Sequence, residues 1–171
     1  MAMNPQLIGK TMPHGFAGSY ARQPDMIVGT RPAGGSDHIL FGAPLQYDDA
    51  GNVVQMGAGS TAAQFVGIAA RELKSSLNYL QQDIGQYAPK EAVPVFQRGS
   101  INVLCLVGTP KLGGAVYLRV AANAEKPTAV VGGLEAEADG GNTVQLTNCQ
   151  WAGAADANSV AELRILTMNN A

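Results

Sequence analysis

The sequence has few of the residues that perform catalytic or metal chemistry. Its 171 residues include 2 histidines, 2 cysteines and 1 tryptophan. A structural zinc site takes about four clustered Cys or His ligands, and no spacing of that kind joins His14 or His38 to Cys105 or Cys149. We therefore expect no metal, no cofactor and no catalytic residue, so the chain should not be an enzyme.

Charged residues are also scarce. They make up 14% of the chain, 11 basic against 13 acidic for a net charge of −2, whereas an average soluble domain has about 25%. A balance this close to neutral gives no attraction to a phosphate backbone, so we expect no nucleic-acid partner. Charged side chains also keep proteins apart in solution, and their scarcity favours self-association.

Long apolar runs are missing. A helix needs roughly 18–20 consecutive apolar residues to cross a bilayer, and no window approaches this length, so we expect no membrane partner. The opening MAMNPQLIGK has no basic region followed by an apolar run, which predicts no secretory signal and synthesis in a cytoplasm. Cys105 and Cys149 are then expected to be reduced, buried thiols. A disulfide between them stays open, because it requires their Cα atoms to lie within about 7 Å.

What the sequence does contain is the period-two alternation of β-strands. Strands are expected over residues 25–30, 38–47, 64–72, 101–107, 114–120, 128–133, 142–148 and 159–168. Turn clusters rich in Asp, Asn and Gly lie at 48–52, 139–142 and 156–158. About eight or nine short strands at intervals of roughly 8–12 residues are typical of sandwiches and barrels. We predict an all-β fold, a jelly-roll-like sandwich or barrel.

The stretch VPVFQRGSINVLCLVG, Val93–Gly108, predicts a strand with two apolar faces. Arg98–Gly99 is expected to form a permissive turn. After it the side chains alternate, with Ile101, Val103, Cys105 and Val107 on one face and Asn102, Leu104 and Leu106 on the other. Such a strand should lie between a core and a second surface, either another sheet or another protein.

The same alternation predicts where other side chains point. Residues 64–72 should place Val66, Ile68 and Ala70 on one face, and residues 114–120 should turn Val116, Leu118 and Val120 inward and Tyr117 and Arg119 outward. The acidic run 134–139 lacks the ligand spacing of a calcium loop, so we expect a solvated strand end or turn. Trp151 is expected in the core.

The domain organisation expected from composition is simple. Residues 1–24 are rich in proline and glycine and have no sustained period, which predicts an extended N-terminal arm. Residues 25–171 should form a single β domain. Within it, Leu73, Leu77 and Leu80 have helical spacing, and a short helix or an irregular segment is expected there.

Three short motifs imitate functional sites without their context. Gly57–Ala62 fits G-x-G-x-x-A but follows a hairpin turn and opens no helix, and Gly108–Gly114 lacks the Lys and Ser or Thr of a phosphate loop. Both are expected to be loops. Ser36-Asp37-His38 names the residues of a triad, but sequence neighbours do not easily converge and no G-x-S-x-G elbow is present. His38 is expected to be a solvated loop residue.

Several stretches, taken in order, resemble the structural cement proteins of tailed bacteriophages. They are GFAGSYARQPDMIVGTRPAGG (15–35), FVGIAARE (65–72), GQYAPKEAVPVFQRGSINV (85–103), GGAVYLRV (113–120) and DANSVAELRILT (156–167). The resemblance spans nearly the whole chain, and its motifs are strand and turn patterns that contain no reactive group.

The resemblance implies a small jelly-roll-like protein that binds the outside of an icosahedral head and clamps neighbouring major capsid subunits, commonly as a homo-oligomer. The partners it implies are the major capsid protein and further copies of this chain, in a homodimer or homotrimer. The implied location is the capsid exterior of the virion, after synthesis in the bacterial host cytoplasm. Two alternatives stay open, a carbohydrate-binding jelly-roll module of a virion and an enzyme on a β scaffold.

Overall fold

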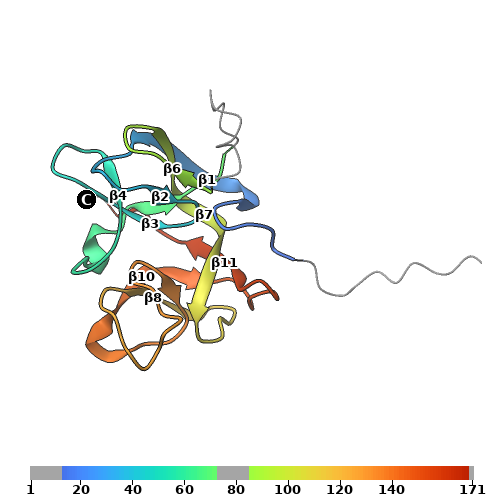
Figure 1. The fold of residues 1–171 in the computed structure, drawn as a ribbon. Coiled ribbons are helices and arrows are strands. Elements are labelled where there is room, and N and C mark those ends of the chain that lie inside the picture. Colours follow the sequence, from blue (N-terminus) through green and yellow to red (C-terminus); the bar gives the residue numbers. More distant parts are fainter. Residues whose placement is uncertain (1–12, 73–84, 170–171) are drawn as a thin grey trace, which may run out of the picture.

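The computed structural model describes residues 13–72 and 85–169, and the regular structure of these residues consists of strands apart from two 3-10 turns (Figure 1). The first strands along the chain are β1 (Tyr20–Pro32), β2 (Ile39–Leu40), β3 (Pro44–Tyr47), β4 (Val53–Gln55), β5 (Gly67–Ala69) and β6 (Gln86–Tyr87). The remaining ones are β7 (Ala92–Val107), β8 (Ala115–Arg119), β9 (Leu134–Glu135), β10 (Thr143–Trp151) and β11 (Val160–Ile165). Two short 3-10 turns, Ala62–Gln64 and Gly140–Asn142, accompany them. The prediction of an all-β fold is confirmed.

Five strands close into a ring, which we call the lower ring. Its order is β7, β9, β8, β10 and β11, and β11 pairs back onto β7. The pairs that close it join core residues, for example Cys105 to Leu134 and Leu163 to Ile101. All neighbours are antiparallel except β7 and β9. Closure of this kind leaves no free sheet edge inside the ring, so the architecture is a barrel rather than an open sandwich.

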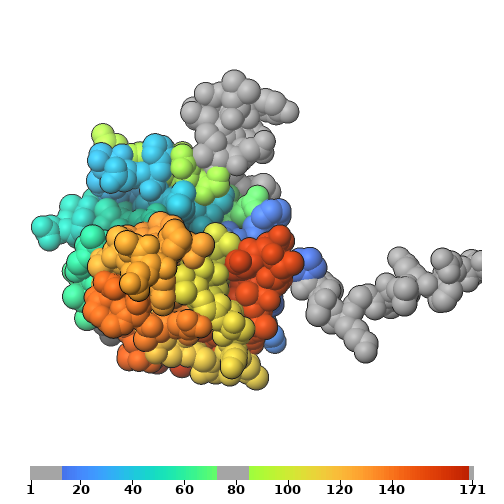
Figure 2. All heavy atoms as spheres, turned by 60° about the horizontal axis from the view of Figure 1, so that its bottom comes forward, coloured from blue at the N-terminus to red at the C-terminus, as the bar shows by residue number. Residues whose placement is uncertain are grey.

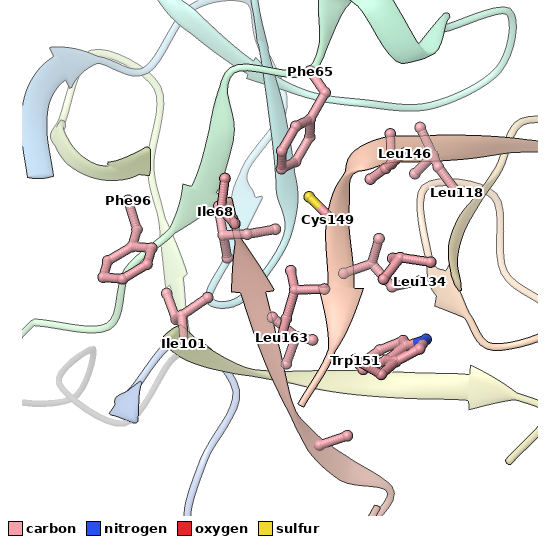
Figure 3. Packing of buried hydrophobic residues seen from close by; sticks show 14 of the residues in the cluster. Phe65, Ile68, Phe96, Ile101, Leu118, Leu134, Leu146, Cys149, Trp151 and Leu163 are labelled. Carbon is pink, nitrogen blue, oxygen red and sulfur yellow. The ribbon is translucent and has the colours of Figure 1, made fainter. Parts of the chain in front are cut away.

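The interior of the lower ring is filled by the larger of two apolar clusters. Figure 3 shows ten labelled side chains of this cluster, and they come from β5, β7, β8, β9, β10 and β11 and from the turn before β5. Trp151, Leu118, Leu146 and Leu163 have no exposed surface. Burying a side chain of this size stabilises the fold by roughly 1.5–3 kcal/mol relative to leaving it exposed. The prediction that Trp151 is a core residue is confirmed.

A second group of strands closes around the other half of β7, and we call it the upper ring. The neighbouring strands in it are, in order, β1, β7, β5, β3 and β4. A bridge between Ala33 and Val53 joins the end of β1 to β4. Its interior is the smaller apolar cluster, which includes Leu45, Val93 and Val95. The short β2–β6 pair contributes Ile39 and Tyr87 to this cluster. In Figure 1, β7 runs from the upper strands to the lower ones.

The turn expected at Arg98–Gly99 is wrong, because β7 continues through both residues as one strand of 16 residues. Instead, the irregularity lies in β1. The register passes from Arg22 opposite Ser100 to Ile27 opposite Arg98, so residues 23–26 face the single position Gly99. Gly99 has a φ of 108°, and a Cβ there would collide with the carbonyl oxygen of Asp25. Gly99 therefore allows a β-bulge between β1 and β7, whereas the sequence predicted a turn that reverses the chain direction.

Other strand predictions also need correction. Residues 128–133 form turns and no strand. β1 begins at Tyr20, inside the segment expected to be an arm. Val66 packs in the upper cluster while Ile68 and Ala70 pack in the lower one, because β5 begins only at Gly67 and the alternation does not extend back to Val66. The helix expected around Leu73, Leu77 and Leu80 lies outside the described residues.

We predict that Gly99→Ala destabilises the fold much more than Gly51→Ala. Both glycines have positive φ, at 108° and 78°, but a Cβ on Gly51 meets nothing within 4 Å. The control should lose about 1 kcal/mol from backbone strain alone, whereas Gly99→Ala should lose on the order of 3 kcal/mol because the β1–β7 contact must open. Urea unfolding of both variants measures the difference, and equal losses would contradict the bulge.

Candidate functional site

An apolar groove lies between the two rings. It has a volume of about 240 Å³ and is lined by Ala17, Leu40–Pro44, Gln55, Leu104, Leu106 and Val130–Leu134. Gln55 is the one lining residue with a polar side chain. In Figure 2 the orange segment that contains residues 120–135 forms a bulge directly below the light-blue segment around residue 40. The groove thus separates parts of the chain that belong to different rings.

Large apolar side chains at this groove are only half covered. Leu40, Leu104 and Val130 are exposed by 51%, 43% and 59%. Single exposed aliphatic side chains are ordinary, but several that share one concave surface mark an interaction site. Leu104 and Leu106 belong to the face of β7 for which a second surface was expected. Both side chains line the groove, and the expected second surface, another sheet or another protein, stays a prediction.

The neighbouring part of the same β7 face is covered by the chain's own N-terminal residues. Asn102 is buried, and its side-chain amide donates to the carbonyl oxygen of His14 at 2.7 Å and to the Ser19 hydroxyl at 3.1 Å. Its backbone carbonyl accepts from the Gly18 N–H at 2.7 Å. These bonds hold residues 14–19 over Asn102 and leave Leu104 and Leu106 to the groove.

One wall of the groove is the long connection between β8 and β9, and backbone bonds fix both of its ends. The Gly132 N–H donates to the Arg119 carbonyl at 2.8 Å, and the Arg119 N–H donates to the Gly133 carbonyl at 2.9 Å. Since Val130 and Gly133 line the groove, the position of this wall depends on Arg119.

The side chain of Arg119 anchors the same wall through a buried ion-pair network. Its Nε and Nη2 donate to the two carboxylate oxygens of Glu135 at 2.6 and 2.8 Å, and neither side chain has exposed surface. Its Nη1 donates to Asp139 at 2.5 Å. A bidentate guanidinium–carboxylate pair is a strong, directional contact, and the hydrogen bond to Glu135 is the main cause that raises the pKa of Arg119.

Asp139 extends this network into the groove wall. It accepts a hydrogen bond from the Asn123 side chain at 2.9 Å, and the Lys126 ammonium lies 3.8 Å away. The hydrogen bonds from Asn123 and then Arg119 lower the pKa of Asp139 to about 2. Because Asn123 and Lys126 belong to the β8–β9 connection, the network ties that connection to both strands.

Two expectations from the sequence are therefore wrong. Arg119 does not point outward into solvent, and Glu135 in the acidic run is fully buried instead of solvated. The alternation in residues 114–120 does put Arg119 on the face opposite Val116 and Leu118, but on that face its side chain pairs with Glu135 of the neighbouring strand β9 and with Asp139. The sequence did contain a signal for this ion pair, because Arg119 lies in a predicted strand and the acidic run 134–139 follows it. The signal does not indicate which of these charged side chains pair.

The triad-like and metal-like residues are not assembled into a site. Ser36, Asp37 and His38 are exposed on the loop before β2, and no hydrogen bond among the described residues joins their side chains. His14 lies elsewhere, with its backbone N–H donating to Asp156 at 2.9 Å. Within residues 13–72 and 85–169 no group of three or more His, Cys, Asp or Glu is placed to hold a metal ion.

The remaining motifs lie where the sequence placed them. Gly57–Ala62 is a loop that ends in a 3-10 turn, and Gly108–Gly114 connects β7 to β8.

Cys105 and Cys149 are free and buried in the lower ring, and burial raises the pKa of the Cys105 thiol to about 11. In the described part of the chain there is no helix with the length and apolarity needed to span a bilayer.

The aromatic side chains do not favour a carbohydrate site. Phe16 is exposed by 68%, but the Arg71 guanidinium lies over its ring at 4.3 Å. Phe41 and Tyr87 pack against each other with ring centroids 4.9 Å apart. Sugar recognition by stacking needs exposed ring faces, and these rings are already engaged within the chain.

Comparison with known proteins gives a consistent result. The sequence model of the family described as "Structural cement protein (E217 gp24/Pam3 gp6)" matches residues 3–166. A chain solved in the capsid of Myoviridae Phage XM1 has a similar fold, with a TM-score of 0.67 and 18% sequence identity, over 98% of this chain and 98% of that chain. Among curated proteins, no match is found.

We predict that Arg119→Met lowers the free energy of unfolding by about 3–5 kcal/mol, because it leaves the Glu135 carboxylate buried without its partner. Arg98→Met is the matched control, since Arg98 pairs with Asp25 at 3.3 Å and the two side chains are about half exposed. An exposed pair contributes about 0–1 kcal/mol. Chemical denaturation measures both losses, and a similar loss in the two variants would contradict a structural role for the buried network.

We further predict that Asp139→Asn changes how stability depends on pH. The pKa of Asp139 falls from its ordinary 3.8 to about 2 in the folded protein, so its charged form stabilises the fold fully above about pH 4 and loses this effect as the pH falls toward 2. The gap in unfolding free energy between the natural chain and the variant should stay constant from about pH 7 to 5 and shrink below about pH 4. Urea titrations across this range test it, and a gap unchanged at the lowest pH would refute it.

Proposed function

The chain belongs to the family of phage structural cement proteins, and from this premise we propose that it binds the outside of the phage head and clamps neighbouring major capsid subunits together. The family is one of structural proteins, and the similar chain was solved in a phage capsid. The single observation that carries the proposal is the family match over residues 3–166, which includes both rings and the groove.

A clamp of this kind stabilises a shell by mass action. A protein that binds the closed arrangement of capsid subunits, and not the separated ones, adds its binding free energy to the stability of the closed shell. Contacts to several subunits act together through effective concentration, so each contact can be modest. Many copies on one head multiply the effect.

The chain has the kind of surface that this function requires. Beyond the groove, Leu166 and Met168 are exposed by 41% and 43%, and contacts through such side chains need no charge partner. In the proposal, the part of the expected arm that precedes Pro13 adds contacts, the protein associates as a homodimer or homotrimer, and no reaction is catalysed. Virion localisation on the capsid exterior follows from the same role.

We predict that the purified protein slows heat-induced DNA release from heads that lack it. A gain of about 1.4 kcal/mol in the barrier to opening would slow release roughly tenfold at fixed temperature. Electron microscopy of the same mixture should show added density on the outer surface at the joints between capsid subunits. DNA release is followed with an intercalating dye.

Two controls make this assay specific. An unrelated all-β protein of similar net charge should leave release unchanged, and a chain that begins at Pro13 should keep the fold but protect less if the arm contributes. That variant retains the bonds of residues 14–19 to Asn102. Heads with no added density and an unchanged rate of DNA release would overturn the proposed function.

A further inference from the structure

The connection between β7 and β8 presents the most exposed large apolar side chain among the described residues. Leu112 is exposed by 81%, at the tip of the segment GTPKLGG whose glycine spacing imitates a phosphate loop. A single exposed leucine on a mobile loop would need no explanation. The question is whether this side chain is held in place.

Backbone bonds hold it in a defined turn. The Gly114 N–H donates to the Lys111 carbonyl at 2.8 Å, which places Leu112 and Gly113 at the two central positions of a β-turn. Gly113 has a φ of 76°, the value that a type II turn requires at its third residue. Leu112 thus stands at the second position of the turn and points away from the chain.

The turn is also bound to the core. The Gly113 N–H donates to the Trp151 carbonyl at 2.8 Å, and the Trp151 N–H donates to the Gly114 carbonyl at 2.9 Å. The Trp151 side chain is fully buried in the lower ring. Because the turn is already ordered, a partner that covers Leu112 would lose little conformational entropy in doing so.

The groove between the rings has the matching character. No charged side chain lines it, and Leu40, Leu104 and Val130 are half exposed there. Its volume of about 240 Å³ is many times what a single water molecule needs, so an aliphatic side chain can enter it. Leu112 is not among the residues that line the groove of its own chain, so a contact between the two would join separate copies.

We propose that Leu112 of one copy inserts into the apolar groove of a second copy. The contact joins two different surfaces of the same protein, so the first copy keeps its groove free and the second copy keeps its Leu112 turn free for further neighbours. Such a contact closes either as a pair with the contact made twice or as a ring. The inference goes beyond attachment to the head, because it names the surfaces through which copies bind each other, and it is tested without heads.

Cross-linking between separate variants tests this contact. Leu112→Cys and Val130→Cys proteins, one carrying a size tag, are mixed and treated with a mild oxidant. We expect the mixed disulfide to form at least tenfold faster than with Ala157→Cys, an exposed position that is outside the groove. Cys105 and Cys149 are buried, and the unmodified chain measures their background. Equal rates with Val130→Cys and Ala157→Cys would overturn the proposal.

A second measurement separates this contact from head binding. Leu112→Gln should weaken self-association at least tenfold in sedimentation experiments, while Lys111→Gln in the same turn should leave it unchanged. If both variants associate like the natural chain, Leu112 does not form the contact and the inference fails. Head attachment of Leu112→Gln is measured separately, so loss of self-association with retained attachment leaves the proposed function standing.

Discussion

The continuous pairing of β7 is the constraint on which the rest of the structure depends. Its first half is bound by β1 and β5 and its second half by β11 and β9, so one strand of 16 residues belongs to both rings. Neither ring closes without it. Each apolar cluster therefore contains residues of β7, with Val93 and Val95 in one and Ile101 and Val103 in the other. A break in β7 would separate the two cores.

The groove is a consequence of this sharing. The outward face of β7 is covered by residues 14–19 over Asn102 and stays partly open at Leu104, which lines the groove and is exposed by 43%. The far wall is held by the Arg119 network, in which Arg119 and Glu135 are buried and joined by a bidentate contact and Arg119 also donates to Asp139. A buried ion pair adds little net stability over an apolar core. Its contribution here is positional, because it fixes a long connection that has no strand of its own.

The sequence predicts the fold class well and the site poorly, and the reason is the same in both cases. Alternation reports which side chains of a strand share a face. This information was sufficient to predict that the second half of β7, β8, β10 and β11 are strands. It does not report what covers the second face. Arg119 was expected in solvent for this reason, since its burial depends on the pairing of β8 with β9, a segment that lies beyond the long connection. Gly99 shows the same limit, because a glycine at a reversal and a glycine at a bulge have one local signature.

The architecture also suits a chain that is rich in strands and has no assembled reactive site among its described residues. Two closed rings with a common strand leave few sheet edges open, and this protects a weakly charged chain from edge-to-edge aggregation. Among the exposed apolar side chains, several gather at the groove, and Leu112 stands on an ordered turn. A structural protein present in many copies needs this combination. Uncontrolled association would remove it from solution before assembly, whereas contact limited to a few rigid surfaces lets copies join only where shape allows.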